Sequence, residues 1–163
     1  MKELLLKYTR YNHWANERIC LLLTSLPAEI LDKEIKSSFT SIRKTLYHLW
    51  DAELIWIERI NGFSFDKWPS ESFDGDIVEA TQLILTNSNR FSDLVSNNDE
   101  EYLNKRISYQ NMKGDEFNNP VWELIMHCMN HSTFHRGQIV TMLREADVKD
   151  IPGTDLILYY RSL

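Results

Sequence analysis

Apolar residues recur every three or four positions through most of the chain. This spacing puts them on one face of an α-helix, because one turn takes about 3.6 residues. It predicts four long amphipathic helices, over about residues 2–25, 41–61, 76–94 and 119–146. Only five glycines and four prolines interrupt the sequence, which favours long helices over many short strands. The predicted fold class is therefore all-α, and the predicted architecture is a four-helix bundle.

Local signals mark where these helices begin and end. Gly62 follows the second helix at the position where glycine commonly ends one. Asp76 is placed to cap the third helix, with Glu79 completing a capping box. Asn119 and Pro120 are expected to open the fourth helix as N-cap and first helical residue. No repeat, low-complexity segment or interdomain linker is evident, so residues 1–163 are predicted to form a single domain.

Three segments outside the helices have their own patterns. Residues 62–75 are aromatic and irregular, and a loop of that length is more often a crossover or a lid than a simple turn. Within it, Trp68 is a stronger candidate for lining a cleft than the tryptophans at helical positions, which are assigned to core or interface. Residues 105–117 change to period two and predict a small β-hairpin with Gly114 at positive φ. Residues 154–161 are expected to form a last helical turn or two.

Composition and charge narrow the class of protein. With 43% hydrophobic and 26% charged residues, the chain has the make-up of a soluble globular protein. A formal charge of −6 and the lack of Lys/Arg-rich runs argue against nucleic acid and anionic membranes as partners. No segment reads as a signal peptide or membrane span. Cys20 and Cys128 are interpreted as reduced, buried thiols, so the expected location is the cytoplasm.

Histidines carry the strongest chemical signal. His127, His131 and His135 are spaced by four residues, so all three project from one side of a helix, and neutral imidazole is a common metal ligand. His131 and His135 fall inside the apolar face of the fourth helix, and His127 lies at its edge. A single pair of this spacing is weak evidence, because most such histidines lie on the surface or bond to a backbone carbonyl.

A catalytic metal site usually has three protein ligands, so another helix has to supply one. His48, on the flank of the buried face of the second helix, is the natural candidate. Cys128 lies one residue off the histidine spacing and is a weaker one. Spacing alone does not choose between His127/His131 and His131/His135 as the pair on the fourth helix.

Four sequence elements together resemble the DinB-like family, also called DinB/YfiT-like. The most specific is NHSTFHRGQ at residues 130–138. The others, in order along the chain, are YNHWANER at 11–18, SIRKTLYHL at 41–49 and ISYQNMKG at 107–114. The resemblance spans nearly the whole chain.

The resemblance implies an up-down-down-up four-helix bundle, with the β-hairpin before its last helix, and a metal held by His48, His131 and His135. His127 then has a supporting or structural role, and Gln138 is expected to orient a ligand imidazole, as groups behind a metal ligand commonly do. Three histidines suit a divalent ion, with zinc or nickel preferred. Relatives include transferases and isomerases that use bacillithiol, mycothiol or glutathione-like thiols, so a low-molecular-weight thiol is an expected co-substrate.

The leading hypothesis is a metal-dependent enzyme that activates a thiol or water to attack a small electrophile, as a thiol S-transferase or a hydrolase. No HExxH arrangement is present, which disfavours a glutamate-assisted hydrolase and leans towards thiol transfer. Catalytic residues and any general base stay unassigned, and whether the protein is an enzyme stays open. The alternatives are a non-catalytic metalloprotein and a stress-linked dimeric binding module with a vestigial site. A homodimer is expected under all three hypotheses.

Three further expectations concern polar residues. Asn12 and Asn16 are expected to bond backbone or neighbouring helices rather than substrate. Arg136 is predicted to lie opposite His131 and to make an ion pair or a dimer contact. Acidic residues are expected on solvated faces, although Glu53 falls on the apolar face of the second helix as a polar exception.

Overall fold

Helices make up most of the computed structural model, which describes residues 1–163. The elements, in chain order, are α1 (Lys2–Thr24), α2 (Ala28–Leu31), α3 (Ile42–Ile60), the 3-10 helix η1 (Pro69–Ser72), α4 (Ile77–Asn97), α5 (Glu100–Asn104), β1 (Arg106–Gln110), β2 (Glu116–Pro120), α6 (Val121–Glu145) and α7 (Leu156–Arg161). The predicted helical fold with one small antiparallel hairpin is confirmed. The short helices α2 and α5 were not predicted, because each is only about one turn long and leaves no periodic signal.

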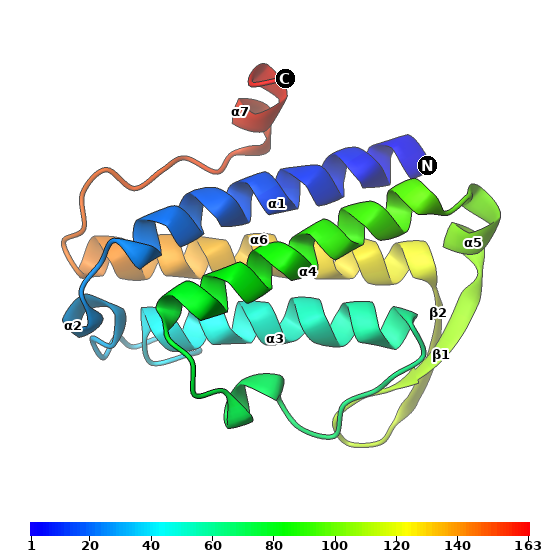
Figure 1. Cartoon of the computed structure of the whole chain (residues 1–163), viewed down its shortest axis with the longest axis horizontal. Coiled ribbons are helices and arrows are strands. Elements are labelled where there is room, and N and C mark those ends of the chain that lie inside the picture. The colour runs from blue at the N-terminus through cyan, green and yellow to red at the C-terminus, as the bar shows by residue number, and fades with distance from the viewer.

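The four long helices form a bundle in which each packs against two others. Helix α1 packs against α4 and α6, and α3 packs against the same two helices from the other side. Figure 1 shows α1 and α6 running in one direction and α3 and α4 in the opposite one. The site histidines come from α3 and α6, which are antiparallel neighbours. No helix is both long and apolar enough to cross a membrane.

The ends of the helices follow the local signals closely, with one exception. Asp76 and Glu79 form a complete capping box at the start of α4, and Gly62 adopts a φ of +88° just after α3. Asn119 and Pro120, expected to open α6, instead end strand β2, where they pair with Ile107 and Arg106. Helix α6 therefore begins at Val121, because the hairpin register holds Pro120 in extended conformation with ψ of 148°.

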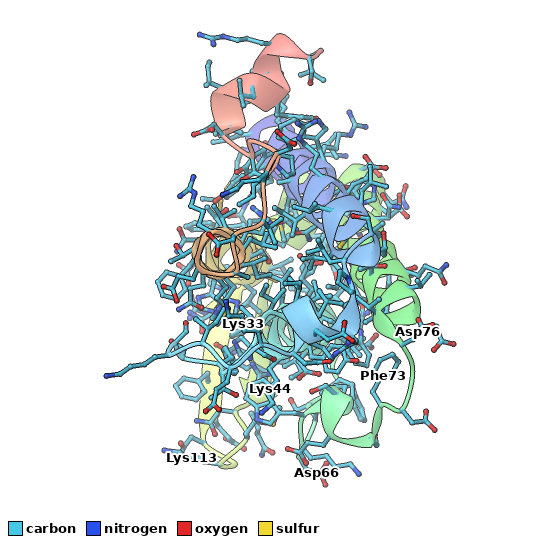
Figure 2. All side chains as sticks on the ribbon, turned by 90° about the vertical axis from the view of Figure 1, so that its left-hand side faces the viewer. Lys33, Lys44, Asp66, Phe73, Asp76 and Lys113 are labelled. Atoms are coloured by element: carbon cyan, nitrogen blue, oxygen red, sulfur yellow. The ribbon has the colours of Figure 1, made fainter.

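The hairpin and the loop between α3 and α4 come together on one side of the bundle. In the view along the bundle, Lys113 at the hairpin tip and Asp66 in the loop lie at the edge opposite α7 (Figure 2). The backbone N–H of Gln110 donates a hydrogen bond to Ser64 Oγ at 3.2 Å, which ties the two segments together. Both segments contact α3, the loop through η1 and the hairpin through β1.

Two apolar clusters fill the bundle, one towards each end. The first contains Leu23, Leu46, Ile84 and Met142, one from each long helix. The second contains Leu5, Ile57, Phe91 and Ile125, again one from each. Between these positions the four helices also carry buried polar residues: Asn12, Asn16, Glu53, Ser88, Ser132 and Arg136. A polar layer therefore separates two hydrophobic cores.

Glu53 is the centre of this layer, which corrects the expectation that acidic residues lie on solvated faces. Its side chain is fully buried. Oε1 accepts hydrogen bonds from Asn12 Nδ2 at 2.7 Å, Asn16 Nδ2 at 2.8 Å and Ser132 Oγ at 3.1 Å. Oε2 accepts one from Ser88 Oγ at 2.7 Å. A carboxylate can be buried here because three other helices supply its donors.

Arg136 completes the layer, so its predicted ion pair or dimer contact is wrong. The residue is only 1% exposed. Its Nη1 donates to Asn12 Oδ1 at 2.5 Å and to Asn16 Oδ1 at 2.8 Å, and its Nη2 donates to Thr133 Oγ1. The guanidinium also lies over the ring of Tyr11. The two asparagines thus bridge a buried positive and a buried negative charge, in agreement with the expectation that they bond neighbouring helices.

Candidate metal centre and its flanking cavities

Three histidines from two helices converge at one point on the side of the bundle. His48 Nε2 lies 3.3 Å from His131 Nε2, and His135 Nε2 lies 3.1 Å from the same atom. The potential ligand atoms of all three lie within 4.8 Å of one another. His131 and His135 share a face because they are one turn apart on α6, and α3 places His48 opposite them. No other histidine, cysteine, aspartate or glutamate joins the group.

This donor set fits a divalent ion. Four-coordinate zinc with Zn–N distances of 2.0–2.1 Å needs ligand nitrogens about 3.3–3.4 Å apart, close to the separations found. The rings are also held in the neutral form that a metal requires. Burial, reinforced by the neighbouring histidines, lowers the pKa of His48 to about 4 and that of His131 to about 3. Burial lowers the pKa of His135 as well, against an opposing hydrogen bond to Gln138.

Groups behind the histidines fix two of the rings. His135 Nδ1 donates to Gln138 Oε1 at 2.7 Å, which leaves the lone pair of Nε2 directed at the other two histidines. The amide of Gln138 is itself oriented, because its Nε2 donates to Ser38 Oγ at 3.1 Å. Phe39 stacks on the His48 ring with the ring centres 4.3 Å apart. His131 Nδ1, in contrast, is buried without a hydrogen-bond partner, so packing alone positions that ring.

His127 does not join the three converging nitrogens. It lies one turn before His131 on α6, with ring centres 5.9 Å apart. Its own ring meets Trp56 of α3 edge-on at 4.7 Å. The structure therefore places His127 beside the cluster rather than in it. The spacing on α6 left two pairs open, His127/His131 and His131/His135. The structure brings His131 and His135 together with His48.

Two cavities flank His48. The first has a volume of about 280 Å³. It is lined by Phe39, Lys44, Tyr47, His48, Asp51, Trp68, Ser70 and Glu71. The second has a volume of about 140 Å³. It is lined by His48, Ala52, Ile55, Trp56, Arg59, Trp68, Met112 and His131. His48 and Trp68 line both cavities, so both cavities adjoin the histidine cluster at His48.

The long loop forms part of the wall of both cavities. Asp51 of α3 accepts hydrogen bonds from the backbone N–H of Ser70 at 2.8 Å and from its Oγ at 2.6 Å, which fastens η1 to α3. Burial raises the pKa of the Asp51 carboxyl, against these two hydrogen bonds. Trp68, just before η1, meets the His48 ring edge-on at 5.4 Å. Asp51 was not named from the sequence as a residue beside the histidines. Its position one turn after His48, on the same face of the helix, could have indicated it.

Comparison with known proteins identifies a family for the chain. The family model described as "DinB family" matches residues 1–162. The chain belongs to the DinB family. Protein DinB of Bacillus subtilis (strain 168) is 35% identical over 166 residues, which cover 98% of this chain and 95% of that protein. The two DinB-family proteins therefore correspond over nearly their full lengths.

Solved DinB-like structures share the fold at much lower sequence identity. A DinB-like protein from Bacillus cereus ATCC 10987 superposes with a TM-score of 0.64 at 18% identity, covering 91% of this chain and 94% of that one. A second, from Bacillus subtilis, gives a TM-score of 0.60 at 15% identity, covering 93% and 94%. At these identities, the structural similarity shows that the chain has the same fold as the two proteins.

Proposed function

We propose that this DinB-family protein binds a divalent metal ion, zinc or nickel, through His48, His131 and His135. We further propose that it uses the ion to activate a low-molecular-weight thiol for attack on a small electrophile. The observation that carries the proposal is the convergence of three neutral imidazole nitrogens, with no fourth protein ligand, beside two cavities. Structural zinc sites usually have four protein ligands, whereas catalytic sites keep one position for water or substrate.

The surroundings of the histidines favour a thiol over water as the nucleophile. None of the three rings is hydrogen-bonded to a carboxylate, and no carboxylate oxygen lies among the converging ligand atoms. The two buried carboxylates nearby are both engaged, Glu53 by the polar layer and Asp51 by Ser70. A bound divalent ion would supply Lewis acidity that lowers the pKa of a thiol without a separate base.

The chain's own residues would hold and orient the reactants. Gln138 keeps the Nε2 lone pair of His135 directed at the cluster, and Phe39 fixes the His48 ring. Trp68, held by the loop that Asp51 fastens, provides an aromatic wall on both cavities. The proposed partner is therefore a small molecule that enters beside His48.

Thiol reactivity tests this function directly. Zinc-loaded protein would be mixed with 2-mercaptoethanol and the electrophile monobromobimane at neutral pH, beside His131→Ala and the control His13→Ala, which changes a half-buried histidine on α1. We expect a rate that saturates with thiol in the wild type and in His13→Ala, and that falls to the background rate in His131→Ala. Equal rates in all three proteins would reject thiol activation.

A further inference from the structure

Arg59 is a buried arginine without a partner. It lies on α3 and is only 6% exposed. Its Nε–H is buried and donates no hydrogen bond, and the guanidinium makes neither a hydrogen bond nor an ion pair with any other group. Its guanidinium lies against two aromatic rings. Its Cζ lies 4.6 Å from the ring centre of Trp56 and 5.4 Å from that of Tyr109.

Such a charge is costly to keep inside a protein. Burial lowers the pKa of Arg59, yet a guanidinium stays protonated at neutral pH. Buried charges are normally paired, because removal from water without compensation is expensive. The other buried arginine is Arg136, in the polar layer. Its guanidinium has three side-chain acceptors. Arg59 has none, although aspartate and glutamate outnumber lysine and arginine in the chain by 24 to 18.

Arg59 lines the second cavity, which also reaches the histidine cluster. Arg59, His48 and His131 all line this cavity of about 140 Å³. No acidic residue lines it, whereas the first cavity contains both Asp51 and Glu71. The remaining wall includes apolar and aromatic groups such as Ile55 and Trp56. The second cavity is therefore a small, positively charged recess with an apolar lining.

We propose that Arg59 binds the carboxylate of a small organic acid in the second cavity, so that the rest of the molecule lies towards the histidines. The inference deepens the proposed function and rests on it in one respect. If the protein activates a thiol at the metal, a thiol that carries a carboxylate would be held at both ends, by Arg59 and by the metal ion. Trp56 and Tyr109 lie against the guanidinium and favour binding at its edge, where two parallel N–H donors match a planar carboxylate. The volume suits about six non-hydrogen atoms, since a cavity of about 150 Å³ holds benzene.

Binding of a simple acid tests the site without any metal. Metal-free protein would be titrated with propionate, its neutral analogue propionamide, and inorganic phosphate, with the fluorescence of the tryptophans as the signal. We expect propionate to bind at least about 10-fold more tightly than propionamide, because charged hydrogen bonds are about twice as strong as neutral ones. Equal affinity for the acid and the amide would overturn the proposal, as would tighter binding of phosphate than of propionate.

Two variants assign the preference to Arg59. Arg59→Met keeps a long apolar stem against Trp56, and we expect it to abolish the preference for propionate. Arg18→Met is the matched control, because Arg18 also lies over a tryptophan ring, at 5.0 Å from Trp14, but on α1 and away from the cavity. It is expected to retain the preference. A preference that survives in Arg59→Met would overturn the assignment.

The stability of Arg59→Met separates binding from packing. Removing an unpaired buried charge is expected to leave the Tm unchanged or to raise it. A marked fall in Tm would assign Arg59 to packing and overturn the proposal.

A thiol acid then tests the link to the metal centre. Zinc-loaded protein would be assayed with 3-mercaptopropionate and 3-mercaptopropionamide, again with monobromobimane. We expect Arg59→Met to raise KM for the acid about 10-fold and to leave KM for the amide unchanged. A KM that rises equally for both thiols would overturn the role of Arg59. If the proposed function fails, neither thiol reacts faster than the background rate, but the titration with propionate still decides the anion site.

Discussion

Nδ1 of His135 donates a hydrogen bond to Oε1 of Gln138 at 2.7 Å, within a single turn of α6. This bond selects the tautomer of His135 whose Nε2 can bind a metal, and Ser38 in turn fixes the Gln138 amide. The loop before α3 thus helps to orient a ligand on α6. Removing such an orienting group commonly costs about 10- to 100-fold in metal affinity.

We therefore expect Gln138→Met to weaken zinc binding about 10- to 100-fold while the helical fold is kept. Competition with a chromophoric chelator measures the affinity, and circular dichroism measures the fold. Gln82→Met, which changes an exposed glutamine on α4, is the control. Unchanged affinity in Gln138→Met would show that packing alone orients His135.

The polar layer is expected to be essential for stability. Glu53→Gln keeps the side-chain shape but removes the charge that balances Arg136 through Asn12 and Asn16. Breaking a buried charge pair typically costs about 3–5 kcal/mol. Urea unfolding is expected to show a loss of that size, and none in Glu101→Gln, which changes an exposed glutamate of α5. A loss below about 1 kcal/mol would mean that the layer tolerates an uncharged centre.

Acid is expected to destabilise the metal-free protein through the histidine cluster. Burial first, and the neighbouring histidines second, hold the pKa of His48 at about 4 and that of His131 at about 3. An unfolded histidine titrates near pH 6.5. Below that pH the unfolded state binds protons that the folded state does not, so stability is lost as pH falls from about 6.5 towards 4.

The triple variant His48→Ala, His131→Ala, His135→Ala isolates this effect. Between pH 7 and 5 the Tm of the metal-free wild type is expected to fall further than that of the variant, and differential scanning fluorimetry measures both. Parallel curves would show that the cluster does not control stability at acidic pH.

Removing the ion is expected to lower stability without unfolding the bundle. The proposed ligands join α3 to α6, and a ligand present at 100 times its dissociation constant adds about 2.7 kcal/mol. For a domain of this size, that corresponds to about 5–10 °C in Tm. Chelation should therefore lower the Tm by this amount and leave the far-ultraviolet circular dichroism unchanged. Loss of helical signal on chelation would favour the alternative of a purely structural metal.

Features with local causes could be predicted from the sequence. The capping box of Asp76 and Glu79 spans four residues, and the spacing of His131 and His135 is set by one helical turn. His48 was a candidate because it lies on the flank of the buried face of α3. The choice of His131 and His135 over His127 and His131 needed the family resemblance, because both pairs have the same spacing. The proposed homodimer has not been tested and stays a prediction.

Features that depend on several helices were missed. Glu53 interrupts the apolar face of its own helix, and only donors from α1, α4 and α6 explain its burial. Arg136 was misplaced for the same reason. Arg59 gave no signal at all, because its isolation depends on the three-dimensional positions of Trp56 and Tyr109 and on the lack of an acid nearby.

Metal content tests the central claim most directly. Untagged protein, isolated without chelators, would be measured by inductively coupled plasma mass spectrometry beside His131→Ala and the control His13→Ala. We predict about one equivalent of a single divalent metal per chain in the wild type and in His13→Ala, and its loss in His131→Ala. Little metal in any of the three proteins, or an equal amount in His131→Ala, would contradict the three-histidine site.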